Sequence, residues 1–380
     1  MDKVRIAIVG AGLSGLYAAY RLERMGIRDY VVLEARDIPG GRIASFDAGN
    51  ETGSKPDGID RFDLGATWFW PDYQPQLSKL IDALNLSRFL QYETGETVIE
   101  RSANALPMRV RGDANTPASM RLSSGMESLV DALRRELDPA RVVMGQAVRR
   151  LRRMDKYVEL DSEDTAGRAR SWRAEHVLLA LPPRLAEQAI TFEPALPKEL
   201  ALQWRATSTW MAPQAKYIAV YDQPFWRGHG LSGEARSGRG PLGEIHDASM
   251  PGGCAALFGF FGLPVQVRRN WPDDVLRSHC RAQLARLFGA QAAVPRADFI
   301  KDWACDPCTA VDLDLSAASS HHAGAPARAA SGPWRHALTG ISSEWSPQFP
   351  GYVAGAVEAA ELGVQAWAAH FSKRRTEPAE

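Results

Sequence analysis

The sequence predicts an α/β fold in which a Rossmann-type dinucleotide-binding domain is joined to a second, α+β domain built on a mixed sheet. Three features at the start of the chain predict the first domain. Residues 4–9 are almost all apolar and mostly β-branched, as in a strand that is buried on both faces. A Gly-x-Gly-x-x-Gly pattern follows at once and leads into the helical apolar spacing of residues 16–25. A second apolar run, residues 30–33, then ends in Glu34.

The three glycines of the pattern have different tasks. Gly10 permits the tight turn, Gly12 lets the backbone approach a pyrophosphate, and Gly15 lets the helix pack closely on the strand. The start of the helix presents free N–H groups and a positive dipole end to the phosphates. Glu34 lies where a carboxylate can accept hydrogen bonds from ribose hydroxyls, which favours FAD or NAD over NADP. The alternative is a tight turn in another kind of α/β protein.

The residues after Glu34 distinguish FAD from NAD. This segment resembles the flavin-dependent amine oxidase family in five residues. They are Glu34, Ala35 and Arg36, followed after a short gap by a Gly-Gly-Arg that ends in Gly41 and Arg42. The resemblance implies a glutathione-reductase-like FAD-binding domain in which all five residues contact the cofactor. Its loop would wrap the pyrophosphate, with Arg42 as the counter-charge and the glycines permitting close approach.

Composition excludes several other classes of protein. The chain has 380 residues, of which 45% are hydrophobic and 24% charged, as in an ordinary globular enzyme of two domains. Its formal net charge is zero, so no nucleic-acid or membrane partner is expected. No apolar run reaches the ~20 residues of a membrane span, and the early first strand leaves no room for a signal peptide. With only four cysteines, we expect a reducing, cytoplasmic compartment. We expect the protein to be a monomer or homodimer.

The resemblance also implies the division into domains. The FAD-binding domain is expected to comprise residues 1–71, 123–190 and 333–380, and the substrate domain residues 72–122 and 191–332. Longer members of the family have a helical insertion that roofs the substrate cavity. Only about 35 residues stand at that point here, so we expect a cavity that is more open or is closed by other means.

Several residues outside the first motif match positions that face the flavin or the adenine in the family. Gly65, Ala66 and Thr67 would bring the backbone against the flavin ring, and the main chain of Val148 would hold the adenine. Trp68 is expected to line the substrate pocket. Packing in the core is the alternative for this tryptophan.

Lys216 is the expected catalytic lysine. It begins an apolar strand on which the family places a lysine that is hydrogen-bonded through water to the flavin N5. The alternative is a solvent-exposed lysine at a strand edge. Phe260, on a second strand, and Trp303, on the strand that returns to the FAD domain, are expected to line the substrate pocket with Trp68.

The C-terminal part resembles the terminal module of the family. Glu344 would bind the ribitol or pyrophosphate side of FAD, and a helix that starts near Val353 would point its N–H groups at the flavin O2. Tyr352 would stand over the flavin ring, as a catalytic residue and a wall of the pocket.

Two departures from the family pattern have consequences for the cofactor. Around Asp312 to Asp314 there is neither the usual second aromatic residue nor a cysteine, so half of the aromatic cage is missing and FAD is expected to be non-covalent. Cys305 and Cys308 form a Cys-x-x-Cys pattern without a second pair, so we expect no metal and interpret them as ordinary thiols.

Together these features predict an FAD-dependent amine oxidase. It would oxidise an amine C–N bond to an imine by hydride transfer to flavin N5, and dioxygen would be reduced to hydrogen peroxide. No protein base is required, because desolvation lowers the pKa of the amine. The alternatives are an L-amino-acid oxidase, a desaturase or dehydrogenase of the same superfold, and a flavin-binding module without turnover.

Overall fold

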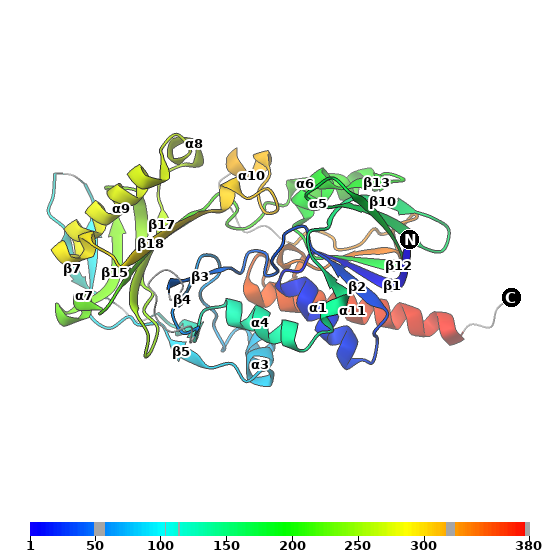
Figure 1. The fold of residues 1–380 in the computed structure, drawn as a ribbon, viewed down its shortest axis with the longest axis horizontal. Helices are drawn as coiled ribbons and strands as arrows, with labels where there is room; N and C mark the ends of the chain where they lie inside the picture. The colour runs from blue at the N-terminus through cyan, green and yellow to red at the C-terminus, as the bar shows by residue number, and fades with distance from the viewer. Residues whose placement is uncertain (49–57, 103, 113–114, 317–323, 377–380) are drawn as a thin grey trace.

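The computed structural model describes residues 1–48, 58–102, 104–112, 115–316 and 324–376. The molecule is elongated, with one large sheet towards each end and the C-terminal helix running beneath the first sheet (Figure 1). Alternating helices and strands around the N-terminal sheet, together with a separate mixed sheet, confirm the predicted fold class. The boundaries between the two domains stay a prediction.

The first sheet has the strand order β13-β10-β11-β12-β1-β2-β9, and β19 pairs with the last part of β12. Its strands are β1 (Asp2–Val9), β2 (Tyr30–Leu33), β9 (Val142–Val143), β10 (Ala147–Arg153), β11 (Val158–Glu163), β12 (Ala169–Leu179), β13 (Thr191–Glu193) and β19 (Leu338–Gly340). β1 runs parallel to both β2 and β12 and is fully buried at its C-terminal end, where the glycine turn begins. This parallel arrangement puts the turn at the carboxyl edge of the sheet, where such folds bind ligands.

Helices cover both faces of this sheet. The helices are α1 (Leu13–Arg24), α3 (Pro75–Ala83), α4 (Glu127–Arg135), α5 (Pro183–Ala189), α6 (Lys198–Ala206) and α11 (Val353–Thr376). Buried residues of α1, α3, α4 and α11 share one apolar cluster, and α5, α6 and the other face of the sheet share a second. In Figure 1, α1 and α11 lie together beneath β1 and β2. None of the helices in the described residues is long and apolar enough to cross a membrane.

The second sheet has the order β18-β14-β17-β16-β15-β6-β7. Its strands are β6 (Glu96–Glu100), β7 (Met108–Arg111), β14 (Ala215–Tyr221), β15 (Leu231–Ser237), β16 (Leu242–Asp247), β17 (Ala255–Phe261) and β18 (Ala297–Asp302). It is mixed, because β15 and β6 are parallel whereas the other pairs are antiparallel. Helix α9 (Asp273–Phe288) covers one face.

The alternation of side chains along β14 decides which residues reach the other face. Tyr217, Ala219 and Tyr221 pack in the cluster with α9. Ile218 and Val220 pack on the opposite side, with the two antiparallel strands at residues 45–47 and 61–63. Lys216 shares that opposite side, because successive side chains of a strand point to opposite faces. The remaining elements are β3 (Ser45–Asp47), β4 (Arg61–Asp63), β5 (Arg88–Leu90), β8 (Met120–Leu122), α7 (Phe225–Gly228), α8 (Val265–Arg268) and α10 (Asp312–Ser316).

Candidate functional site

A cavity of about 590 Å³ is lined by residues of both large sheets and of the C-terminal module. Nearly all residues singled out in the sequence lie on its wall. They are Gly10, Gly12, Glu34, Ala35, Arg36, Gly41, Arg42, Gly65, Ala66, Thr67, Trp68, Val148, Lys216, Phe260, Trp303, Tyr352 and Val353. Gly15 and Glu344 lie behind the wall, and each supports a residue that lines it.

The glycine turn forms a close-packed cradle at one end of the cavity. Gly10 has a φ of +105°, which favours glycine, and a Cβ on Gly15 would lie 1.9 Å from the Gly10 carbonyl oxygen. The Gly41 loop also approaches the turn, since a Cβ on Gly41 would lie 3.2 Å from the Gly12 Cα. Gly10, Gly12 and Gly41 line the cavity at the α1 N-terminus, so the free N–H groups of that helix end can be reached by a phosphate.

Glu34 is buried, with 4% of its surface exposed, at the end of β2. Its Oε2 accepts a hydrogen bond from the Ala11 N–H at 2.6 Å, and its Oε1 accepts one from the Arg36 N–H at 3.0 Å. A carboxylate has about four acceptor sites, so the two oxygens can still accept ribose hydroxyls from the cavity side. The chemistry of this donor and acceptor set fits the adenosine half of FAD.

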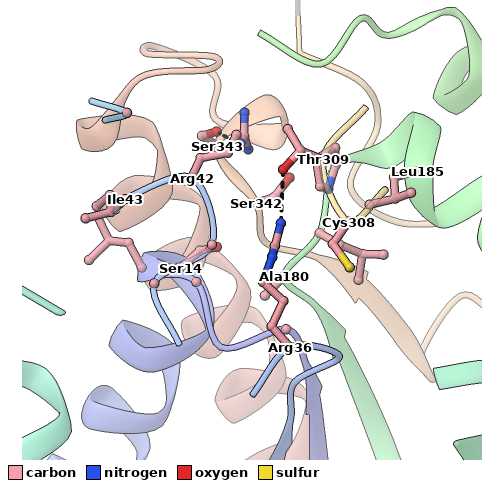
Figure 2. A pocket seen from close by; sticks show the side chains of 18 of the residues that line it. Ser14, Arg36, Arg42, Ile43, Ala180, Leu185, Cys308, Thr309, Ser342 and Ser343 are labelled. Atoms are coloured by element: carbon pink, nitrogen blue, oxygen red, sulfur yellow. Dashed lines mark hydrogen bonds between the residues drawn. The ribbon is translucent and has the colours of Figure 1, made fainter. Parts of the chain in front are cut away.

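Arg36 connects this end of the cavity to the Cys-x-x-Cys segment. Its Nη2 donates to Asp306 Oδ1 at 2.7 Å. The same nitrogen donates to Thr309 Oγ1 at 3.1 Å, a contact that Figure 2 shows. Burial alone would raise the pKa of the Asp306 carboxyl, but the charges of Arg36 and Lys301 outweigh it and lower that pKa. Cys308 and Thr309 therefore line the cavity beside Arg36, which the sequence pattern of the cysteines did not indicate.

Arg42 lies on the wall with Glu344 directly behind it. Its guanidinium makes a bidentate pair with the Glu344 carboxylate, at 2.5 and 2.9 Å, and donates to Ser343 Oγ at 3.2 Å. Burial alone would raise the pKa of the Glu344 carboxyl, but Arg42 and the Ser342 hydroxyl outweigh it, so the pKa is lowered and the group is ionised. Glu344 thus fixes Arg42 and Ser343, which Figure 2 shows side by side at the cavity.

Lys216 is 1% exposed, so the alternative of a solvent-exposed lysine is wrong. Its Nζ donates to the Asp63 and Gly65 carbonyl oxygens at 2.8 and 3.1 Å and to Thr67 Oγ1 at 2.6 Å. Burial lowers the pKa of the ammonium from 10.5 to about 7, with the Asp63 carboxylate opposing the shift. The lysine therefore fixes the segment from Asp63 to Thr67, the one expected to approach the flavin, and its charge is poised near neutral pH.

Aromatic side chains from three separate segments line the cavity near Lys216, and one of them, Phe260, lies on strand β17 of the second sheet. Trp303 donates from Nε1 to the Leu64 carbonyl oxygen at 3.0 Å. A Cβ on the neighbouring Gly65 would lie 1.9 Å from the Arg42 carbonyl oxygen and 3.3 Å from the Trp303 ring, so there is no room for a side chain. Trp68 donates to Gln91 Oε1 at 2.8 Å, and its ring centroid lies 6.4 Å from that of Phe260. All three aromatic residues, which were expected to line the substrate pocket, lie on the wall of this cavity.

A second group of aromatic rings surrounds Tyr352. The Trp70 ring meets it edge-on at 6.2 Å, and the Trp210 ring stacks on it at 6.4 Å with 29° between the planes. Val353 begins α11, whose first turn borders the same part of the cavity. Trp210 was missed in the sequence, because the segment between α6 and β14 has neither periodicity nor a motif.

Comparison with protein families gives two matches. The family model of flavin-containing amine oxidoreductases matches residues 99–366, and the model of NAD(P)-binding Rossmann-like domains matches residues 8–84.

Several curated proteins are similar over most of the chain. A probable flavin-containing monoamine oxidase A of Dictyostelium discoideum is 24% identical over 400 residues, covering 78% of this chain and 83% of that protein. A putrescine oxidase of Kocuria rosea is 26% identical over 456 residues, covering 89% and 90%. A putative flavin-containing monoamine oxidase of Mycobacterium tuberculosis is 32% identical over 259 residues, covering 63% and 51%.

Solved structures share the fold. A putrescine oxidase bound to putrescine superposes with a TM-score of 0.76 at 22% identity. A cyclohexylamine oxidase from Brevibacterium oxydans superposes with a TM-score of 0.78 at 20% identity. Each comparison covers 97% of this chain and 99% of the other.

Proposed function

Because this chain belongs to the flavin-containing amine oxidoreductases, we propose that it is an amine oxidase that converts an amine C–N bond to an imine and passes the electrons to dioxygen. The protein is an oxidoreductase and its cofactor is FAD. The proposal extends to a neutral small-molecule amine as the substrate, hydrogen peroxide as the second product, and a cytoplasmic monomer or homodimer as the working form.

The observation that carries the proposal is the continuity of the cavity. One wall runs from the glycine turn and Glu34, which suit a dinucleotide, to the aromatic rings around Tyr352 and Trp68, which suit an apolar organic group. Lys216 lies on the same wall. A substrate at the aromatic end would therefore meet the redox end of a cofactor whose adenosine half lies at the glycine turn.

FAD, when bound, supplies the two-electron acceptor for the hydrogen on the amine α-carbon. Gly10, Gly12 and the α1 N-terminus would hold its pyrophosphate, with Arg42 as counter-charge. Glu34 would accept hydrogen bonds from the ribose. The main chain of Val148 would border the adenine.

The aromatic end prepares the amine by excluding water. A desolvated amine favours its neutral form, which is the form that can give up a hydride equivalent from the α-carbon. Tyr352 and Trp70 supply apolar faces there, and the first turn of α11 directs its N–H groups and positive dipole end to the same region. That end stabilises negative charge, as reduction of the cofactor requires.

We further propose that FAD is held without a covalent bond. The resemblance to the family would place an attaching cysteine around Asp312 to Asp314, where this chain has none and where Asp314 is buried in an ion pair with Arg184. The cysteine on the described wall, Cys308, lies beside Arg36 at the adenosine end.

The test is anaerobic titration of the purified holoprotein with a panel of amines and amino acids. An amine oxidase loses the oxidised flavin spectrum on mixing, regains it on admission of air, and forms hydrogen peroxide. Bleaching only by L-amino acids indicates the amino-acid oxidase, and bleaching without reoxidation in air indicates a dehydrogenase. A flavin that no compound bleaches indicates a binding module and contradicts the proposal.

A further inference from the structure

The most deeply buried ion pair near the cavity joins Arg184 on α5 to Asp314 on α10. Their side chains are 7% and 1% exposed, and Arg184 Nη1 lies 2.5 Å from Asp314 Oδ1. A charged pair this far from water is maintained only where its remaining hydrogen-bonding groups are also satisfied. The groups that satisfy them show what the pair holds in place.

Every further contact of the pair ties down the chain around the end of α6 and the start of α10. Arg184 donates from Nε to the Arg205 carbonyl oxygen at 2.8 Å and from Nη2 to that of Ala206 at 3.1 Å. Asp314 Oδ1 accepts from the Thr209 N–H at 3.0 Å, and Oδ2 accepts from the Val311 N–H at 3.1 Å. The pair therefore fixes both ends of the segment that leads into Trp210.

The segment after Thr209 is a tight, unusual turn. Ala212 N–H donates to the Thr209 carbonyl oxygen at 3.2 Å and Gln214 N–H to that of Met211 at 3.0 Å. Met211 has a φ of +61°, a left-handed conformation that a side-chain-bearing residue adopts only when its surroundings impose it. The turn thus has one imposed shape, and that shape presents Trp210 to the cavity.

A second feature, far away in the sequence, makes room for the same ring. A Cβ on Gly351 would lie 2.6 Å from Trp210 Cβ and 2.9 Å from Trp210 Cγ. Gly351 also has a φ of +85°, so glycine suits this position for both reasons. The result is that Trp210 stacks on Tyr352, the next residue, and both rings line the cavity.

We propose that Trp210 is a specificity-determining residue of the amine subsite, that Arg184 and Asp314 are its positioning pair, and that the preferred substrates are monoamines with an aromatic group. This rests on the proposed function. Stacked and edge-on ring contacts are the geometries that aromatic pairs prefer, and Trp70, Trp210 and Tyr352 present such faces.

The charges on the wall agree with a monoamine. Within the described part of the chain, the carboxylates that line the cavity are Glu34, Glu163 and Asp164, which follow or end strands of the first sheet. None of these comes from the second sheet or from the Trp210 turn. A second ammonium on the substrate would therefore have no carboxylate partner among the described residues of the aromatic end.

The test compares benzylamine, butylamine and butane-1,4-diamine as anaerobic reductants of the holoprotein flavin, with the dissociation constant and the limiting rate measured separately. Benzylamine should bind most tightly. Trp210→Ala should raise its dissociation constant about tenfold and that of butylamine less than about threefold, since one aromatic contact is lost. Trp210→Phe should restore most of the loss. Equal effects on the two amines, or a preference for the diamine in the wild type, would overturn the assignment.

The positioning role is tested by a double-mutant cycle. Asp314→Asn should weaken benzylamine binding in the wild type and have no further effect in the Trp210→Ala background. Glu100→Gln is the matched control, because Glu100 at the end of β6 is equally buried and pairs with Arg286 on α9, away from the turn. If Asp314→Asn fails to fold, Arg184→Met with Asp314→Leu replaces the pair by apolar volume, which is often tolerated. Additive effects of Asp314 and Trp210 would refute the positioning role.

A binding measurement separates this inference from the proposed function. Benzamide is aromatic and is not an amine substrate, and its binding is followed by the perturbed flavin spectrum and by the thermal melting temperature. If no amine bleaches the flavin, the proposed function fails, yet Trp210→Ala should still weaken benzamide binding about tenfold. Unchanged benzamide binding would sink the inference whether or not amines are oxidised.

Discussion

Replacement of Lys216 by methionine tests whether the buried ammonium on the cavity wall takes part in the reaction of the reduced flavin with dioxygen. The ammonium donates to three acceptors at 2.6 to 3.1 Å and is buried, so its charge is fixed in a site with little water. A cation in such a place stabilises the negative charge that develops when dioxygen accepts an electron. Removing one preorganised group of this kind costs ~10²–10³-fold in rate. Reoxidation by dioxygen should slow by that factor, whereas flavin reduction by an amine, which depends on C–H transfer, should change little.

The pKa of Lys216 adds a pH signature to this prediction. With a pKa of about 7, the amine of Lys216 is about nine-tenths charged at pH 6 and about one-tenth charged at pH 8. Wild-type reoxidation should therefore fall about tenfold between these values. The Lys216→Met protein has no group to titrate, so its slower reoxidation should be independent of pH over the same range.

Stopped-flow measurement of the two half-reactions decides the matter. Lys301→Met is the matched control, because Lys301 lies opposite Lys216 on the neighbouring strand and its ammonium pairs with Asp306 at 3.2 Å. Its removal should leave reoxidation unchanged. If both half-reactions of Lys216→Met slow together, the lysine is structural or binds substrate. If neither changes, its charge has no part in the reaction.

Three further predictions concern the cofactor and stability. Acid precipitation should release FAD into the supernatant, and a yellow pellet would contradict non-covalent binding. Glu34→Ala should weaken FAD binding by ~1–3 kcal/mol, because ribose hydroxyls lose a buried acceptor, and full flavin occupancy at low FAD would refute this. Unfolded lysine keeps its proton up to a pKa of 10.5 whereas Lys216 releases it near pH 7, so the unfolded state binds more protons between these values and stability rises with pH. Chemical denaturation at several pH values measures how the free energy of unfolding changes with pH. The contribution of Lys216 to this slope, at most ~1.4 kcal/mol per pH unit, should be absent from Lys216→Met, and equal slopes in both proteins would contradict the shifted pKa.

The sequence allowed the prediction of features that are encoded locally. The strand, glycine turn, helix and acid of the N-terminal motif are contiguous, so their geometry follows from the order of the residues, and Glu34 accepts a hydrogen bond from the Ala11 N–H of the glycine turn. The same holds for the start of α11 near Val353. For Lys216, the periodicity of β14 indicated a strand, but its burial depends on the packing of β3 and β4 against that strand, which no local pattern specifies.

Features that depend on long-range contacts could not be predicted. Arg42 and Glu344 were both expected to bind the cofactor, and that stays a prediction; what the sequence did not indicate is that the two side chains pair with each other, with Arg42 on the cavity wall. The sequence alone does not indicate which residue a charged side chain will pair with. The Cys-x-x-Cys segment is a similar case, because its place beside Arg36 depends on Asp306, one of the two residues between the cysteines.

Asp314 shows that a residue type can be missing from its usual sequence position without being missing from the site. The residue at this position is an aspartate and not an aromatic residue, and its carboxylate is buried and paired with Arg184. That carboxylate binds the Thr209 N–H and so fixes the turn in which Trp210 stacks on Tyr352. A ring is thus present beside Tyr352 although it comes from a different segment, and the residue that lies where an aromatic was expected helps to hold it. The shape of a site is set by which side chains meet in space, and several sequence positions can supply the same one.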